Sequence, residues 1–162
     1  MVTFREASTS DPAAAALLDQ YFATRSEGFP ADQGAYRRPT VDAAQFAPPH
    51  GAFLVVEGEN LAGEPADVGC GGIRRISDGP HGSRFEVKHL WIQPHARRLG
   101  AGRALMLELE SRARATGAAE LVLDTHEAQT AAAALYASLG FTLVERFNDN
   151  PNATIWLGKR LD

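Results

Sequence analysis

The sequence predicts a mixed α/β fold in which antiparallel strands predominate, and two patterns carry this prediction. Three compact extended segments follow one another, with glycine-rich or polar connections between them: Ala52–Glu57, Val68–Ile76 and Arg84–Ile92. The period then changes to that of a helix over Leu99–Ala115, and Gly117 stands where a C-terminal cap belongs. The 162 residues can bury a core of their own, and we expect one domain spanning 1–162.

The elements before these strands are a strand, a helix and a long loop. Val2–Glu6 can form a short first strand. Asp11 and Pro12 supply a cap and a first-turn proline for a helix that we expect to end near Arg25. Prolines and glycines then interrupt Ser26–Pro49, apart from a brief helical stretch at 41–46, so this segment is predicted to be a functional loop.

The elements after the long helix are short strands and one more helix. Leu121–Leu123 is predicted to be a short buried strand, and Thr130–Leu139 an alanine-rich helix stopped by Gly140. The closing strands are predicted at 141–144 and 153–157.

Composition argues against several classes of function. The net charge of -4 and the pI near 5.7 disfavour a nucleic-acid partner. Cys70 is the only cysteine, which rules out an internal disulfide and paired-thiolate metal sites and is consistent with a reducing compartment. No stretch approaches the roughly 20 apolar residues that span a bilayer, and Met1–Ala7 carries no targeting pattern. We therefore expect a cytoplasmic protein without a membrane partner.

The histidines do not form a metal motif. His89, His95 and His126 lie near the segments that carry the chemistry, but none has a ligand spacing to another histidine or acidic residue. No metal is therefore expected. His126 could shuttle a proton, although an exposed loop histidine without such a duty is the more frequent case.

The most informative segment joins a strand to a helix through a basic, glycine-containing turn, Arg97–Arg103. The first amides of a helix have no intrahelical acceptors, the helix dipole is positive there, and Gly100 and Gly102 let a phosphate approach the backbone. The Walker loop and the dinucleotide fingerprint do not fit these residues. The turn predicts an anion site; the alternative is a helix whose glycines only permit close packing.

This turn resembles the signature of the GNAT superfamily of N-acetyltransferases, Gln/Arg-x-x-Gly-x-Gly/Ala, over Arg97–Gly102. Leu135–Phe141 is similar to the family's later Leu-Tyr-x-x-x-Gly-Phe pattern, at a fitting distance. The resemblance is close over 84–145, and the turn at Asn148–Pro151 is similar to that of some small bacterial members. It implies a mainly antiparallel central sheet flanked by helices on both faces, with acetyl-CoA bound where neighbouring strands part.

The resemblance also implies which residues hold the cosubstrate. Those expected at the pyrophosphate of coenzyme A are Arg97, Leu99, Gly100, Ala101, Gly102 and Arg103, and those expected along the pantetheine are Leu90, Trp91 and Ile92. Arg98 departs from the glycine that many relatives have, and it either contacts the adenosine 3′-phosphate or points to solvent. Gln129 and Thr125 stand where relatives often bond the pantetheine, although a helix-capping role fits them as well.

Tyr136 is the first candidate for the chemistry that the resemblance implies. Its phenol can donate a proton to the departing coenzyme A thiolate. Helical spacing places it about 100° from an apolar stripe, at the edge of a cleft; the stripe consists of Ala131, Leu135 and Leu139. The alternative is a core tyrosine whose hydroxyl is satisfied within the protein.

Glu86 is the second candidate, as the base that removes a proton from the acceptor ammonium, directly or through water. On an ideal strand Glu86 shares one face with Lys88, Leu90 and Ile92, beside the cofactor channel, and a bulge would change that register. A solvated pair of Glu86 and Lys88 is the alternative.

The predicted function is direct transfer, in a ternary complex, of an acetyl group from acetyl-CoA to a primary amine of a small-molecule or peptide acceptor. The two motifs contain no cysteine for a covalent intermediate, and Cys70 is left as a remote exception. In the long loop, Phe29 and Tyr36, with Phe46, are predicted to line the acceptor cleft. A non-catalytic coenzyme A-binding regulatory domain is the alternative, and an edge strand or the C-terminal segment could support a homodimer.

Overall fold

The computed structural model describes the backbone of residues 1–162 and every side chain except that of Arg98. The predicted phosphate contact of Arg98 therefore lies outside the described side chains. The strands and helices follow in this order: β1 (Thr3–Glu6), α1 (Pro12–Glu27), β2 (Gly51–Glu59), β3 (Pro65–Gly79), β4 (Gly82–Ile92), α2 (Ala101–Ala115), β5 (Glu120–Thr125), α3 (Thr130–Ser138), β6 (Thr142–Leu143) and β7 (Ile155–Arg160). Short 3-10 segments lie at Ala31–Gln33, Ala43–Phe46 and Pro94–Leu99. Within the described chain, no helix has both the length and the apolar character needed to cross a membrane.

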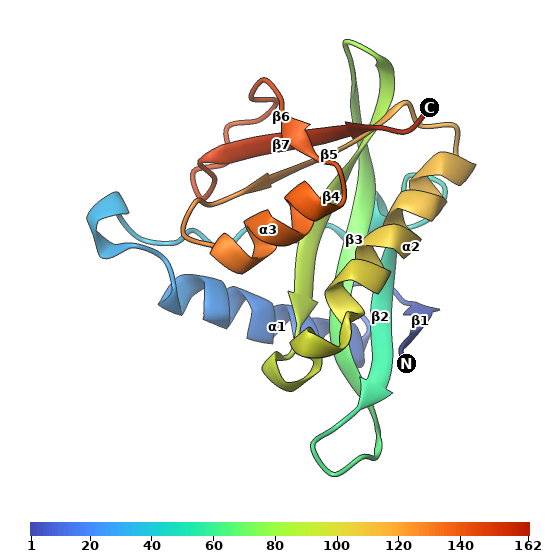
Figure 1. Cartoon of the computed structure of the whole chain (residues 1–162), viewed down its shortest axis with the longest axis vertical. Helices are drawn as coiled ribbons and strands as arrows, with labels where there is room; N and C mark the ends of the chain where they lie inside the picture. The colour runs from blue at the N-terminus through green and yellow to red at the C-terminus, as the bar shows by residue number, and fades with distance from the viewer.

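The strands form one mixed sheet in the order β1-β2-β3-β4-β5-β7-β6 (Figure 1). All neighbouring pairs are antiparallel except β4 and β5. Strands β2, β3 and β4 form a meander because only short turns connect them, whereas α1 and the long loop lie between β1 and β2. The parallel pair requires a crossover, which α2 provides. The predicted mainly antiparallel sheet is confirmed.

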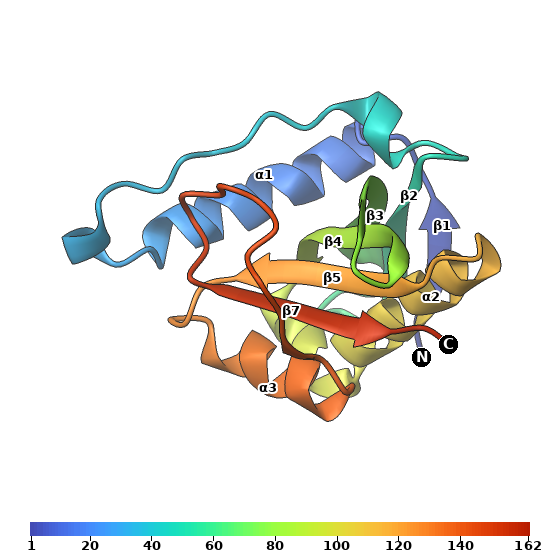
Figure 2. The ribbon, with the colours of Figure 1, turned by 90° about the horizontal axis from the view of Figure 1, so that it is seen from above.

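Helices cover both faces of this sheet, as Figure 2 shows, with α1 on one side and α2 and α3 on the other. The α1 side has a core of its own, in which Leu17, Leu18 and Phe22 pack against Phe53 and Trp91. A larger core on the opposite side gathers α2, α3 and the facing strand residues. Burial of these two apolar layers is the main force that holds the helices against the sheet.

The helix ends follow from local chemistry. Asp11 caps α1, since its carboxylate accepts hydrogen bonds from the amides of Ala13 and Ala14. Helix α2 begins at Ala101, two residues after the predicted start, because Pro94–Leu99 forms a 3-10 segment and Gly100 turns the chain with a φ of 77°. Such a positive φ favours glycine strongly.

Strands β4 and β5 separate along their length. Their parallel ladder runs from Arg84↔Glu120 to Glu86↔Val122 and ends there. Beyond this point β4 continues to Ile92 and β5 to Thr125, and the two ribbons diverge (Figure 1). The ladder's end leaves backbone groups of both strands facing the opening, where a ligand can bond them.

A β-bulge interrupts β4 at His89. Cys70 pairs with Trp91, and Gly72 pairs with Lys88. Between these two pairs, β3 has one residue and β4 has two, so β4 carries one extra residue. His89 adopts a φ of 60°, which is uncommon for a residue with a side chain. The extra residue reverses the alternation of side chains between the two faces of the sheet.

Candidate functional site

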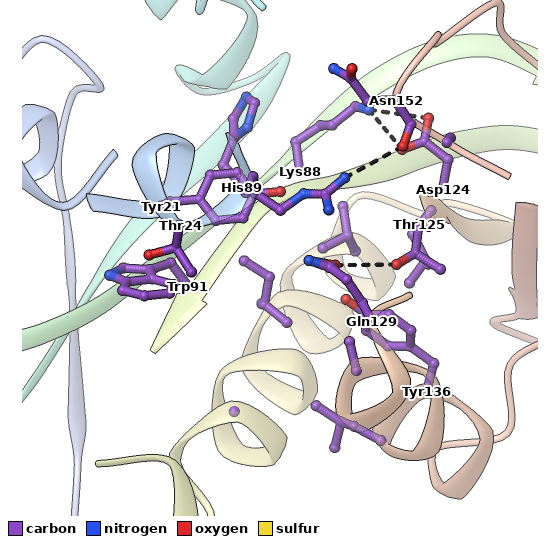
Figure 3. A pocket seen from close by; sticks show the side chains of 18 of the residues that line it. Tyr21, Thr24, Lys88, His89, Trp91, Asp124, Thr125, Gln129, Tyr136 and Asn152 are labelled. Atoms are coloured by element: carbon purple, nitrogen blue, oxygen red, sulfur yellow. Dashed lines mark hydrogen bonds and ion pairs between the residues drawn. The ribbon is translucent and has the colours of Figure 1, made fainter. Parts of the chain in front are cut away.

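The opening between β4 and β5 is a cavity of about 840 Å³. It runs from the glycine turn at the start of α2, past the diverging strands, to the C-terminal end of α1 and the turn at 148–153. Figure 3 shows its lining side chains converging from α1, β4, β5 and α3. A cavity of this size can enclose a small molecule on several sides.

The glycine turn offers unpaired backbone donors to one end of the cavity. Gly100 is the N-cap of α2 and supplies no side-chain cap, and the first intrahelical bond runs from the Ala104 amide to the Gly100 carbonyl, 3.0 Å. The amides of Ala101, Gly102 and Arg103 therefore have no intrahelical acceptor. A Cβ at Gly100 would have no heavy atom within 4 Å, so the space above the turn is open. These features fit a phosphate-bearing cosubstrate.

Two arginines flank this turn. Arg97 donates from Nε to the Ile92 carbonyl at 2.9 Å, and its guanidinium carbon lies 4.9 Å from the Trp91 ring centroid. Arg103 donates to the Ser138 hydroxyl at 3.3 Å. Both line the cavity, together with Gly100 and Gly102. Leu99 is exposed and Ala101 is buried, so these two residues contribute only their backbone to the turn.

The predicted pantetheine-binding stretch lies along the open edge of β4. Leu90, Trp91 and Ile92 all line the cavity. The side chains of Leu90 and Ile92 pack on the α2 side, whereas Trp91 packs on the α1 side and donates from Nε1 to Gln20 Oε1 at 3.2 Å. The open edge of β4 therefore presents its backbone N–H and C=O groups to the cavity, between the two faces of the sheet.

Tyr136 reaches the cavity from α3. Its ring packs against Phe141 at 6.1 Å between centroids, and the residue is 7 % exposed. Burial raises the pKa of Tyr136, so its phenol stays protonated at neutral pH. The predicted stripe on α3 is wrong, because Ala131 is exposed and the buried positions are Tyr136 and Leu139. Tyr136 therefore stands on the buried face, with its ring in the core and a surface on the cavity.

Glu86 lies on the other side of β4 from Leu90 and Ile92, so the predicted shared face is wrong. The reason is the bulge at His89, which moves the later residues to the opposite face. Glu86 is 1 % exposed and lies outside the cavity lining. Its Oε1 accepts from Arg74 at 3.0 Å, and its Oε2 lies 3.3 Å from Lys88 Nζ.

Lys88 and Asp124 form the centre of a buried polar cluster. Lys88 Nζ lies 3.0 Å from Asp124 Oδ1 and 3.2 Å from Oδ2, as Figure 3 shows. Asn148 donates to Asp124 Oδ2 at 2.6 Å and Asn150 to Oδ1 at 3.2 Å. Asn148 in turn accepts from Trp156 Nε1 at 2.9 Å. The turn at Asn148–Pro151 thus contributes two amide side chains to this cluster.

His89 is held neutral in an aromatic environment. Its ring lies 5.2 Å from Phe22 and 5.6 Å from Phe46 between centroids. Burial, with the positive charges of Lys88 and Arg74, lowers the pKa of His89 to about 3. It is therefore uncharged at physiological pH and cannot pair with an anion in the cavity.

The predicted acceptor residues of the long loop separate into two groups. Tyr36 lines the cavity, and burial raises the pKa of its phenol to about 12. Phe29 packs behind it, 5.9 Å from the Tyr36 ring and 5.3 Å from the His126 ring, and is not a lining residue. Phe46 is buried in the core against Phe53. Loop packing therefore explains Phe29 and Phe46.

His126 is buried, contrary to the expectation of an exposed loop histidine. Its Nδ1 accepts from the Ala128 amide at 3.0 Å, so its Nε2 carries the proton and donates to Gln33 Oε1 at 2.6 Å. This hydrogen bond holds the part of the long loop around Gln33 against His126, which directly follows β5. Across the described side chains, no group of three His, Cys, Asp or Glu residues could hold a metal ion.

Gln129 and Thr125 meet at the entrance to α3. Thr125 Oγ1 donates to Gln129 Oε1 at 3.4 Å, and both residues line the cavity (Figure 3). Gln129 precedes α3 without making a side-chain cap. The capping alternative therefore does not describe Gln129 in this structure, and its amide faces the cavity.

Several lining residues were not predicted from the sequence. They are Tyr21, Thr24 and Arg25 of α1, Arg74 of β3, Lys88 and Asp124 at the strand divergence, and Asn152. A signal existed for Asp124, because a carboxylate directly follows the apolar strand run that ends at Leu123. Tyr21 and Arg25 lie on the same helical face as the buried residues Leu17, Leu18 and Phe22, so their spacing placed them toward the sheet but did not distinguish a cavity residue from a core residue.

The sequence matches a known family over most of its length. The model of the Acetyltransferase (GNAT) family matches residues 15–141. An IAA acetyltransferase from Azospirillum brasilense is 31 % identical over 140 residues, which cover 86 % of this chain and 84 % of that protein. A mycothiol acetyltransferase from Thermobispora bispora is 44 % identical over 66 residues, 41 % of this chain and 21 % of that protein.

Solved structures share the whole fold. A provisionally assigned acyl-CoA N-acyltransferase from Klebsiella pneumoniae subsp. pneumoniae MGH 78578 is 27 % identical, with a TM-score of 0.76 over 100 % of this chain and 99 % of that one. An acetyltransferase of the GNAT family from Staphylococcus aureus Mu50 is 14 % identical, with a TM-score of 0.72 over 100 % of both chains, and supports the fold alone. Three observations agree: the sequence of the glycine turn, the divergence of β4 and β5, and the match to the family model. The chain therefore belongs to the GNAT acetyltransferase family and is an acyltransferase enzyme.

Proposed function

We propose that this enzyme, acting as one domain of residues 1–162, transfers an acetyl group from acetyl-CoA to a primary amine of its acceptor. One observation carries the proposal: a single cavity connects the free amides at the start of α2 with the Tyr136 phenol. The anion-binding end and a protonated acid are thereby joined along an open strand edge. This is the arrangement that a long, phosphate-bearing thioester requires.

In the proposal, the turn at 99–103 binds the pyrophosphate of acetyl-CoA, with Arg97 and Arg103 adding positive charge beside it. The backbone of β4 from Leu90 to Ile92 bonds the pantetheine amides, because the ladder with β5 has ended before that stretch. Gln129 lines the opposite wall and can donate or accept there. An amide of β4 near Leu90 can also polarise the thioester carbonyl.

Tyr136 is proposed as the acid that protonates the departing thiolate. The phenol is protonated because burial raises its pKa, and it lies in the cavity wall formed by α3. As the carbon–sulfur bond breaks and the carbon–nitrogen bond forms, the phenol proton passes to sulfur. Nitrogen loses its second proton as the amide forms, and solvent in the cavity carries a proton back to the tyrosinate, so the protons balance.

Direct transfer from thioester to amine is proposed, without an acetyl-enzyme intermediate. Cys70 is buried on β3, outside the cavity lining, and burial raises its pKa. A protonated thiol is a poor nucleophile. Positioning both reactants in one cavity replaces covalent catalysis.

Glu86 enters the proposal as a positioning residue. Its carboxylate bonds Arg74 and Lys88 behind the cavity wall, so the acceptor ammonium loses its proton to solvent. Glu86→Gln should lower kcat less than about tenfold and leave the acidic limb of the pH–kcat/KM profile in place. Loss of that limb would identify Glu86 as the base.

Initial-velocity kinetics test the proposed function. Thiol release from acetyl-CoA is measured against a panel of primary amines, and mass spectrometry identifies the N-acetylated product. Direct transfer predicts intersecting lines when both concentrations are varied. Parallel lines would indicate an acetyl-enzyme, and an absence of N-acetylated product with every amine in the panel would contradict the proposal.

A further inference from the structure

We infer that the amine acceptor carries a carboxylate and that Arg25 binds it. The inference rests on the proposed function, because it concerns the acceptor end of the same cavity. It goes further by naming the chemical class of the acceptor: amino acids and other amines with a nearby carboxylate.

Arg25 lies on the last turn of α1 and lines the cavity. Its guanidinium carbon lies 5.3 Å from the centroid of the Tyr36 ring, and Nη2 donates to the Asn152 carbonyl at 3.4 Å. The aromatic ring covers one face of the guanidinium, and its edge keeps donors for a further partner. A planar guanidinium of this kind matches the two oxygens of a carboxylate.

The other charges at this end of the cavity cancel each other. Lys88 pairs with Glu86 and Asp124, and Arg74 pairs with Glu86 at 3.0 Å. Two carboxylates therefore face two cations. Arg25 has no carboxylate within ion-pair distance among the described side chains, and it leaves the acceptor end with a surplus positive charge.

The cosubstrate does not explain this surplus charge. Arg25 belongs to α1, on one face of the sheet, whereas the glycine turn opens α2 on the other face (Figure 2). Arg97 and Arg103 already supply positive charge at the turn. A ligand that reaches Arg25 must therefore come from the acceptor side of the strand divergence.

The wall that holds Arg25 is fixed by Asn152, which is 6 % exposed. Asn152 Oδ1 accepts from the Arg37 amide at 2.9 Å, and Nδ2 donates to the Arg37 carbonyl at 2.6 Å. This pair of bonds joins the long loop to the 148–152 turn next to Arg25. The guanidinium is thereby held between Tyr36 and Asn152 before any ligand binds, which lowers the entropic cost of binding.

Arg25 shares its cavity with Tyr21 and with the residues at the strand divergence. Burial raises the pKa of the Tyr21 phenol, so this neighbour stays neutral and does not offset the positive charge of Arg25. An acceptor whose carboxylate binds Arg25 would keep its amine within the cavity that also contains the strand divergence.

Matched acceptors test the inference. The twenty L-amino acids and their C-terminal amides are assayed in pairs by calorimetry, in the presence of coenzyme A, and by acetyl transfer from acetyl-CoA. We expect at least one acid to bind and react at least tenfold better than its amide. Arg25→Gln should remove this preference, Arg25→Lys should retain part of it, and Arg160→Gln, on the exposed surface, should leave it unchanged.

The two readouts separate the inference from the proposed function. Amides that bind and react as well as their acids, or a preference that survives in Arg25→Gln, would overturn the inference while the acetyltransferase proposal stands. Acids that bind through Arg25 without being acetylated would support a carboxylate site at Arg25, but they would contradict the proposed transfer and the assignment of these acids as acceptors. Failure of every acid to bind would overturn the inference outright.

Discussion

Lys88 Nζ lies 3.0 Å from Asp124 Oδ1, so an ion pair joins β4 to β5 just beyond the last rung of their ladder at Glu86↔Val122. The side chains are 14 % and 5 % exposed. Where backbone pairing has ended, this pair sets the distance between the strands. The width of the cavity therefore depends on two side chains of opposite charge.

Removal of one partner should destabilise the protein strongly. Asp124→Ala leaves Lys88 buried with one carboxylate fewer, and we expect a loss of about 3 kcal/mol in the free energy of unfolding. Urea denaturation measures it. Asp78→Ala breaks an exposed pair with Arg75 and should cost less than about 1 kcal/mol. Equal losses for the two variants would contradict the structural role of Lys88 and Asp124.

The acid role of Tyr136 predicts a selective kinetic defect. Tyr136→Phe keeps the ring that packs on Phe141 and removes only the hydroxyl. We expect kcat to fall about 100-fold, while the Kd for acetyl-CoA, measured by calorimetry, stays within about twofold. An unchanged kcat would remove Tyr136 from the chemistry.

Gly100 and Gly117 offer a matched pair at the two ends of α2. Both have positive φ, 77° and 82°, and a Cβ at either would meet no heavy atom within 4 Å. Asparagine tolerates this conformation, so Gly100→Asn and Gly117→Asn should each cost about 1 kcal/mol or less. Only Gly100→Asn should weaken acetyl-CoA binding, by tenfold or more, because its side chain occupies the approach to the helix amides. Equal affinities in calorimetry would contradict the phosphate assignment.

His89 predicts a dependence of stability on pH. Its pKa is about 3 in the folded protein and near 6.5 in the unfolded chain, so the unfolded chain binds the proton first as the pH falls. The contribution of His89 is complete above pH 6.5 and is lost progressively toward pH 3, by about 2 kcal/mol at pH 5. Asparagine tolerates the φ of 60° at this position. Between pH 7 and pH 5, the free energy of unfolding of His89→Asn should therefore fall by about 2 kcal/mol less than that of the unchanged protein. Parallel urea-denaturation curves for both proteins would contradict this.

The fold was largely predictable because its signals are local. Hydrophobic period, the Asp11 cap and the glycines around α2 identify the elements without any long-range information. The bulge at His89 was not predictable in its detail, because a left-handed histidine is an exception to local preference. That one residue decides whether Leu90 and Ile92 share a face with Glu86.

The site was predictable at its cosubstrate end and much less so at its acceptor end. The glycine turn and Tyr136 each belong to a short sequence pattern, and the residues of each pattern lie close together in the chain. Arg25, Lys88 and Asp124 come together only through the packing of α1 and the divergence of two strands. The sequence spacing of these three residues does not predict that they line one cavity.

Calorimetry with acetyl-CoA, on protein freed of copurifying ligand, tests the central claim most directly. The account predicts one site per chain with a Kd of about 1 μM to 1 mM, the range of substrate constants in enzymes. Dephosphorylated coenzyme A, titrated under the same conditions, reports how much the adenosine 3′-phosphate adds. Measurable binding of acetyl-CoA would support the cavity as the cosubstrate site, and absence of binding would contradict the cosubstrate and the transfer reaction together.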